Sequence, residues 1–178
     1  MHRVHHHRHR GVSLVECAIA VAVSATALGL AVPNLTDLRD RHRLDGVAAQ
    51  LETDLMLARS EAVARNDGVR LDLQGDAAGS CYVLHDGRAG DCRCTATELP
   101  VCRAGVQAIR HARFPAAGPI QVSSRSASIV FDPALGTVTP TATIKVSGAA
   151  GTVHQVINIM GRVRSCVPAP GRAGYPTC

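Results

Sequence analysis

The first feature of the hydrophobic pattern is a long and mostly apolar run near the N-terminus. Between Val12 and Val32, 21 residues contain one charged side chain, that of Glu16. A helix of this length extends about 32 Å, close to the roughly 30 Å hydrocarbon core of a bilayer. The pattern therefore predicts an apolar, membrane-spanning helix over residues 12–33.

A second apolar pattern follows, with steps of three and four residues. It predicts an amphipathic helix over residues 34–66 that packs on a folded head, with charged residues such as Asp54 on the opposite side. Pro33 is expected to kink or loosen the helix without ending it, because the pattern resumes directly. Asn66-Asp67-Gly68 is a typical helix stop. The apolar stripe consists of Leu44, Val47, Ala48, Leu51, Leu55, Ala58 and Ala62.

From Val69 onward the apolar residues alternate with polar ones, and turn signals such as Asp86-Gly87 and Ser147-Gly148 separate the segments. This period predicts an antiparallel β head over residues 67–178. The fold class is therefore α+β, a long N-terminal helix packed on an antiparallel sheet or sandwich. The expected strands are 69–74, 80–85, 120–124, 127–132, 142–147, 152–159 and 162–166.

Composition excludes several classes of function. Aromatic residues make up 2% of the chain, which argues against a surface that stacks bases on aromatic rings. The single lysine, Lys145, follows no glycine-rich loop, so a phosphate-binding P-loop is excluded. The sequence contains no metalloprotease, serine-hydrolase or dinucleotide motif, so we expect no enzyme activity and no cofactor. We interpret the adjacent His85 and Asp86 as turn residues.

Charge is distributed unevenly, although the net charge is only +5. Residues 101–178 contain seven arginines and one lysine against a single acid, Asp132. This asymmetry favours an anionic partner for the C-terminal half. Arg162 and Arg164 are two residues apart and point the same way on a strand, where their guanidinium groups suit the phosphates of DNA. The alternative is that both are solvated and touch nothing. Gly161 before them would allow close approach of a partner backbone. Expected companions are Arg103, Arg110, Arg113, Arg125, Lys145 and Arg172.

Glu16 is unusual because a carboxylate inside a membrane helix costs about 2.5–3.5 kcal/mol. If the chain is cut after Gly11, the new amine of Val12 on a neighbouring copy can neutralise it. The alternative is that Glu16 reaches the lipid headgroups. Arginines lie before the apolar run, so the N-terminus is expected in the cytoplasm and the head outside the inner membrane.

Seven cysteines are present, and six of them follow the apolar helix. An even number in an oxidising compartment predicts disulfides. We expect a Cys166–Cys178 bridge and further bridges among Cys81, Cys92, Cys94 and Cys102. A zinc site is the alternative, but the spacing matches zinc ribbons poorly, so no metal is expected.

Four features of the sequence occur together: residues 11–16 followed by the apolar run, Pro33, the stretch 51–65 and the segment 161–164. Together they resemble the GspH/FimT family of minor pilins and pseudopilins. The segment from Gly11 to Glu16, followed by the apolar run, resembles a prepilin signal, although Val12 stands where the family more often has Phe. Pro33 lies where pilin helices commonly carry proline. The stretch 51–65 resembles the L-x-x-D-L-x-x-A-R-S-E-A-type helix that family members share. The segment 161–164 resembles the G-R-x-R motif of FimT-like proteins.

The resemblance implies a non-catalytic component of a type IV pilus or type II secretion filament. It implies that prepilin peptidase removes residues 1–11 and that Val12 is N-methylated. Other pilins would be partners, with Glu16 and Pro33 in the assembly helix. The G-R-x-R motif is associated with DNA capture, which supports double-stranded DNA as a partner. One alternative is a GspH-type pseudopilin of type II secretion without DNA binding. Another is a single-pass inner-membrane protein with a periplasmic ligand-binding β domain.

Overall fold

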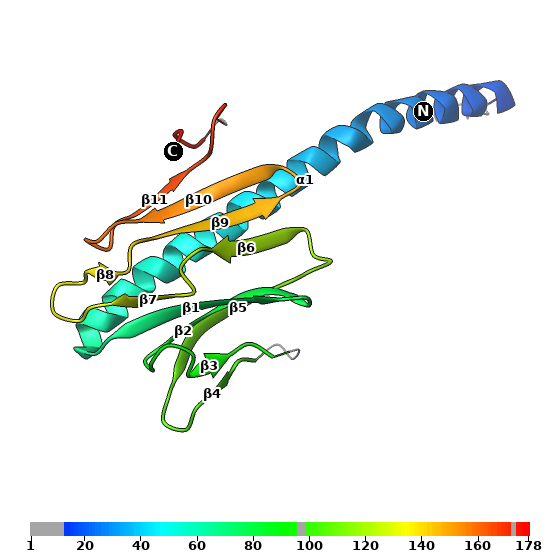
Figure 1. Ribbon diagram of the computed structural model, residues 1–178. Helices are drawn as coiled ribbons and strands as arrows, with labels where there is room; N and C mark the ends of the chain where they lie inside the picture. Colours follow the sequence, from blue (N-terminus) through cyan, green and yellow to red (C-terminus); the bar gives the residue numbers. More distant parts are fainter. Residues whose placement is uncertain (1–12, 96–98, 172–173) are drawn as a thin grey trace, which may run out of the picture. The chain divides into compact units, whose positions relative to one another are not determined.

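The computed structural model in Figure 1 describes residues 13–95, 99–171 and 174–178, with the side chains of 27, 28 and 30–34 left out. Helix α1 spans Leu14–Arg65 and continues through Pro33, so the expectation that this proline does not end the helix is confirmed. The chain divides into two compact units at Leu38/Arg39. All strands belong to the second unit, the head.

Both ends of α1 are capped by local sequence. At its start, Ser13 Oγ accepts a hydrogen bond from the Glu16 amide at 3.2 Å, as an N-cap serine does. At its end, Asn66 adopts φ 51°, and the Asp67 amide donates to the Ala62 carbonyl at 3.2 Å. This is a Schellman ending, in which a left-handed residue turns the chain back onto the last helical turn. The predicted helix stop is therefore confirmed.

In the described residues, eleven strands form two main sheets and a two-stranded sheet, all with antiparallel pairing. The five-stranded sheet has the order β5-β2-β1-β7-β8 and the four-stranded sheet the order β11-β10-β9-β6, while β3 pairs with β4. The strands are β1 (Val69–Asp76), β2 (Gly79–His85), β3 (Cys92–Arg93), β4 (Val101–Cys102), β5 (Ala108–Pro115), β6 (Ile120–Ser124), β7 (Ser128–Phe131), β8 (Val138–Thr139), β9 (Ala142–Gly148), β10 (Gly151–Ile157) and β11 (Val163–Cys166).

The two sheets meet where the chain passes from β6 to β7. The Val122 amide of β6 donates to Ser80 Oγ of β2 at 3.0 Å, and the Leu73 amide of β1 donates to the Ala127 carbonyl at 2.7 Å. Within the head, the C-terminal part of α1 lies along one side of both sheets (Figure 1). The opposite face of the four-stranded sheet is therefore turned away from the helix.

The core is the interface between α1 and the sheets. The helix contributes an apolar stripe whose buried members are at most 1% exposed, as the sequence pattern predicts. Facing strand residues such as Leu71, Ile129 and Ile144 are fully buried. Burial of this aliphatic area supplies most of the favourable free energy of folding. Val47, also expected in the stripe, is only partly buried against this core. The buried members are Leu44, Ala48, Leu51, Leu55, Ala58 and Ala62.

Polar side chains also join the helix to the sheets. The prediction that Asp54 lies on the polar side of the helix is wrong: it is 6% exposed and accepts a hydrogen bond from the Tyr82 hydroxyl at 2.7 Å. The buried tyrosine supplies the donor that makes this burial tolerable. On the other sheet, Gln155 Nε2 donates to the Ala48 carbonyl at 2.9 Å, and Ser165 Oγ donates to Glu52 at 2.5 Å.

The predicted strands correspond to seven of the structure's strands, but β5 was not expected. It lies at the edge of its sheet and pairs with β2 alone, and its basic residues Arg110, His111 and Arg113 hide the period-two pattern. Charged residues are common on edge strands because they discourage pairing with other chains. The two-residue strands β3, β4 and β8 are too short to produce a periodic signal.

Candidate functional site

The outward face of the four-stranded sheet gathers basic and hydroxyl side chains. On β9, Ala142, Ile144 and Val146 are buried, whereas Thr143 and Lys145 are exposed. This alternation follows from the pleat of a strand, which sends successive side chains to opposite faces. The sequence of β9 therefore presents its only cation to solvent on the side away from α1.

Arg162 and Arg164 lie beside this face, at the β10–β11 hairpin. Arg164 is exposed and sits opposite Val156 in the strand register. Arg162 is also exposed, and its backbone bonds with Asn158: the Asn158 amide donates to the Arg162 carbonyl at 3.1 Å, and the Arg162 amide donates to Asn158 Oδ1 at 3.0 Å. Strand pairing thus holds Arg164 beside β10, and turn hydrogen bonds hold Arg162 beside Asn158.

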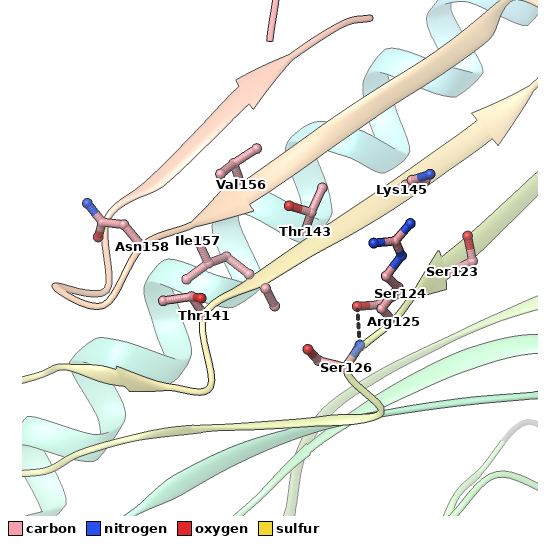
Figure 2. A pocket seen from close by; sticks show the side chains of 11 residues that line it. Ser123, Ser124, Arg125, Ser126, Thr141, Thr143, Lys145, Val156, Ile157 and Asn158 are labelled. Carbon is pink, nitrogen blue, oxygen red and sulfur yellow. Dashed lines mark hydrogen bonds between the residues drawn. The ribbon is translucent and has the colours of Figure 1, made fainter.

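A groove of about 840 Å³ lies on the same face, between the β6–β7 connection and the ends of β9 and β10. Figure 2 shows Arg125 and Lys145 on its β6 side and Asn158 at the other end, with Thr143 and Val156 between them. The connection is shaped by a hydrogen bond from the Ser126 amide to Ser124 Oγ at 3.1 Å. We call Arg125, Lys145, Arg162 and Arg164 the basic face.

The positive charge of the basic face is not balanced by acidic residues of the C-terminal segment. Residues 133–178 contain no aspartate or glutamate. Among the described residues, none of the four cations of the basic face forms an ion pair. Burial and the charge of Lys145 lower the pKa of His154, which faces Lys145 across β9 and β10. The face therefore carries a positive field suited to an anion.

Other basic residues of the C-terminal half lie elsewhere. Arg103 Nε pairs with Asp91 Oδ1 at 3.3 Å, and Arg113 Nη1 donates to the Thr95 carbonyl. Arg110 is on β5, in the other sheet. The structure thus separates the basic face from arginines that sequence alone grouped with it. Arg172 lies outside the described residues.

Gly161 has a structural role that the sequence analysis did not anticipate. It is buried at φ +70°, and a Cβ there would approach the Gly136 carbonyl oxygen to 2.4 Å and the Arg59 side chain to 3.2 Å. The close approach assigned to a partner backbone is therefore made by the chain's own residues. Gly161 fixes the turn that presents Arg162 instead of forming part of the basic face.

The six cysteines of the head form three disulfides: Cys81–Cys94, Cys92–Cys102 and Cys166–Cys178. These pairings agree with the expected tail bridge and with bridges confined to residues 81–102. The tail bridge lies beside the basic face, with Cys178 Sγ 3.6 Å from His154 Nδ1. Across the described residues, no group of three or more His, Cys, Asp or Glu side chains is arranged to hold a metal ion.

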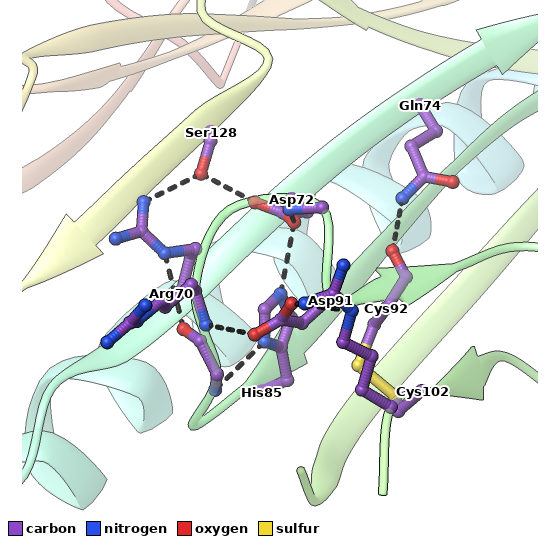
Figure 3. A network of polar contacts seen from close by, with 12 residues as sticks. Arg70, Asp72, Gln74, His85, Asp91, Cys92, Cys102 and Ser128 are labelled. Carbon is purple, nitrogen blue, oxygen red and sulfur yellow. Dashed lines mark hydrogen bonds and ion pairs between the residues drawn. A yellow bond between two sulfur atoms is a disulfide. The ribbon is translucent and has the colours of Figure 1, made fainter.

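A buried polar network occupies the opposite part of the head. His85 Nε2 lies 3.1 Å from Asp72 Oδ2, and these side chains are 0% and 4% exposed (Figure 3). Asp72 also accepts hydrogen bonds from Ser128 Oγ at 2.5 Å and from the Gly90 amide at 2.7 Å. Burial alone would raise the pKa of Asp72, but these hydrogen bonds and that of His85 hold it below its usual value.

This network joins β1 and β2 to β7 and to the loop 86–91, and its carboxylate and imidazole are almost fully buried, so we interpret it as structural. His85 and its sequence neighbour Asp86, expected together as turn residues, have different partners in the structure. Asp86 instead accepts from the Gln107 amide at 2.8 Å. Strand register brings Asp72 near His85, because Asp72 pairs with Val83 on the adjacent strand. No local sequence signal contains this information.

The N-terminal unit is described from Ser13 onward. Gly11 and Val12, the predicted cleavage and methylation residues, lie outside the described residues. Glu16 is exposed in the first turn of α1, where the helix dipole favours a negative charge. Pro33 lies within α1, and its role in assembly stays a prediction. None of the helices in the described part of the chain combines the length and the apolar character needed to cross a membrane.

Known proteins share both the sequence pattern and the fold of this chain. The family model described as Type II transport protein GspH matches residues 47–161, which contain most of the head and the amphipathic stripe. The chain belongs to the GspH family. A pilin-like protein, PilA1, from Thermus thermophilus is 29% identical over 156 residues, which cover 87% of this chain and 97% of that protein.

The fold is also that of a solved minor pilin. The crystal structure of the type IV minor pilin FimU from Pseudomonas aeruginosa matches with a TM-score of 0.53 at 18% identity, covering 75% of this chain and 95% of FimU. The predicted α+β pilin-like fold and the predicted membership of the GspH/FimT type are confirmed. The chain is a minor pilin or pseudopilin, a structural component of a filament built from pilin-like proteins.

Proposed function

We propose that this chain is a FimT-like minor pilin of a type IV pilus that binds double-stranded DNA through Arg162 and Arg164. The observation that carries the proposal is the exposure of both arginines at one hairpin, beside a sheet face without acids. Guanidinium groups form paired hydrogen bonds with phosphate oxygens. The binding is therefore directed at the DNA backbone and tolerates any base sequence.

Assembly and location belong to the same proposal. Prepilin peptidase cuts after Gly11, Val12 is methylated, and the apolar part of α1 anchors the protein in the inner membrane with its head in the periplasm. The Glu16 carboxylate then pairs with the amine of Val12 on a neighbouring pilin in the filament. The length and apolar composition of residues 12–33 and the position of Glu16 support this part of the proposal.

A GspH-type pseudopilin of type II secretion is the second candidate. It is favoured by the family model, whose description names type II transport. In that role the head contacts other pseudopilins or secreted proteins, and DNA is not a ligand. The two candidates share the fold and the assembly helix, so they differ in the ligand of the basic face.

A DNA-binding measurement separates the candidates. The full-length protein, purified in detergent, is titrated with a short duplex of arbitrary sequence at several salt concentrations. We expect a steep loss of affinity with salt, and Arg162→Ala/Arg164→Ala should reduce the logarithmic salt slope by about 1.8, for two lost phosphate contacts. The matched control is Arg93→Ala/Arg110→Ala, which removes two exposed arginines from strands outside the four-stranded sheet. Identical binding by wild type and the Arg162/Arg164 variant would remove this pair from the site.

A further inference from the structure

The groove next to the hairpin has a defined arrangement of side chains across the sheet. In the strand register, Thr143 of β9 pairs with Val156 of β10, and Val156 pairs with Arg164 of β11. On the other side, Ser124 is the last residue of β6 and pairs with Ile144 of β9. Arg125 follows Ser124 directly, and both Arg125 and Thr143 line the groove. A row Thr143–Val156–Arg164 therefore crosses β9, β10 and β11, and Arg125 follows the end of β6 on the other side of Thr143.

The dimensions of this row follow from the sheet. Neighbouring strands are about 4.8 Å apart, so the backbones of Thr143 and Arg164, which are two strands apart, are separated by roughly 10 Å. Lys145 lies two residues from Thr143 on the same face and adds a third cation about 7 Å along the strand. Arg164 thus stands at one end of the row and Arg125 and Lys145 lie beside its other end, while the row itself also contains a hydroxyl and an aliphatic side chain.

The lining of the groove suits a phosphodiester chain better than free bases. Its cations are Arg125 and Lys145, its apolar surface comes from Val156 and Ile157, and it contains no acid and no aromatic ring. Ammonium, guanidinium and hydroxyl groups donate to phosphate oxygens, and aliphatic side chains can contact the sugar. Without a ring to stack on, a base gains little in this groove. Hydroxyl donors line it at Ser123, Ser124, Ser126, Thr141 and Thr143.

We propose that this groove seats one phosphodiester backbone of the bound duplex, which runs across the sheet from Arg125 and Lys145 to the Arg162–Arg164 hairpin. This inference rests on the proposed DNA binding and extends it from a pair of arginines to a site on two sides of the sheet. The groove volume of about 840 Å³ lies within the range of roughly 300–1,000 Å³ found for ligand sites. The hairpin and the groove are continuous because Val156 and Asn158 line the groove and pair with Arg164 and Arg162.

The test compares three double variants of the full-length protein in detergent, with the same duplex and a salt series. Arg125→Ala/Lys145→Ala removes the groove cations, Arg162→Ala/Arg164→Ala removes the hairpin pair, and Arg93→Ala/Arg110→Ala is the control for net charge. All of these residues are exposed, so the folds are expected to survive, and thermal unfolding checks this for each variant.

We expect the groove variant to bind at least about tenfold more weakly than wild type, and its logarithmic salt slope to fall by about 1.8. The control variant should keep a slope near that of wild type. Loss of the same size in the groove and control variants would overturn the groove site, because it would show an effect of net charge alone.

The remaining outcomes distinguish the two proposals. A wild-type slope in the groove variant together with a reduced slope in the hairpin variant would overturn the groove and leave the proposed function intact. No measurable duplex binding by wild type at low salt would overturn the proposed function, and the groove site with it.

Discussion

Asp54 and Asp72 are carboxyl groups inside the head, and each is held by specific donors. Asp54 is bonded by the Tyr82 hydroxyl, and burial together with the Asp54 carboxyl raises the pKa of Tyr82 above its usual range. Asp72 is bonded by Ser128, Gly90 and His85. For single residues such as these, the hydrogen-bond donors to a carboxyl group decide whether its burial is tolerated. These partners come from other strands or from the helix.

Removal of the Tyr82 hydroxyl tests the first of these contacts. Tyr82→Phe keeps the aromatic ring in the core but leaves the buried Asp54 carboxyl without its donor. We expect the free energy of unfolding to fall by about 1–3 kcal/mol in urea titrations. Asp54→Ala/Tyr82→Phe completes a double-mutant cycle, and additive effects of the two single changes would contradict a direct coupling.

The pH dependence of stability tests the second contact. The pKa of Asp72 is lower in the folded state than its usual value of 3.8. Its contribution to stability is therefore complete above that value and is lost as the pH falls through the folded pKa. Urea unfolding at about pH 6 and about pH 3 should show that wild type loses part of its advantage over Asp72→Asn in acid. A constant difference between the two proteins would contradict this linkage.

At the scale of elements, sequence periodicity predicted the helix, its stop at Asn66 and most of the strands. These features depend on local spacing and on one residue's backbone preference. The edge strand β5 was missed because its arginines interrupt the alternation, and the Asp72–His85 contact was missed because strand register creates it. The arginine pair was found from spacing, but its link to the Arg125–Lys145 groove needed the order of the four strands. Gly161 was assigned to a partner because the sequence does not show that Gly136 and Arg59 approach it.

Gly161→Ala tests the structural role of this glycine. A methyl group would meet the Gly136 carbonyl oxygen, and alanine rarely adopts φ +70°. We expect a loss of more than about 1 kcal/mol in the free energy of unfolding. Arg162→Ala/Arg164→Ala serves as the control, because exposed substitutions should stay within about 0.5 kcal/mol of wild type. Wild-type stability of the glycine variant would contradict the tight turn.

At the scale of the whole molecule, the chain combines an apolar N-terminal helix with a head that presents a basic face. The head has its own core, formed by the helix from Leu44 onward and the two sheets. In the unit before Arg39, large apolar side chains such as Leu14, Val23 and Leu38 are exposed. These features fit a protein that assembles through its helix and binds its ligand through its head.

Glu16→Ala tests the assembly half of this account. We expect cleavage of the leader to continue, because the substitution leaves Gly11 in place. Incorporation into filaments should fall, because the amine of a neighbouring copy loses its carboxylate partner inside an apolar environment. Immunoblots of sheared filaments and of membranes measure the two steps separately. Wild-type amounts of Glu16→Ala protein in the filament fraction would contradict the pairing.

The most direct test of the central claim, that this chain is a pilin-like filament subunit, is the mass of the protein isolated from its native envelope. Intact-mass and N-terminal peptide spectra report where the mature chain begins. We expect a chain that starts at methylated Val12, without residues 1–11. A mature protein that still begins at Met1 would contradict it.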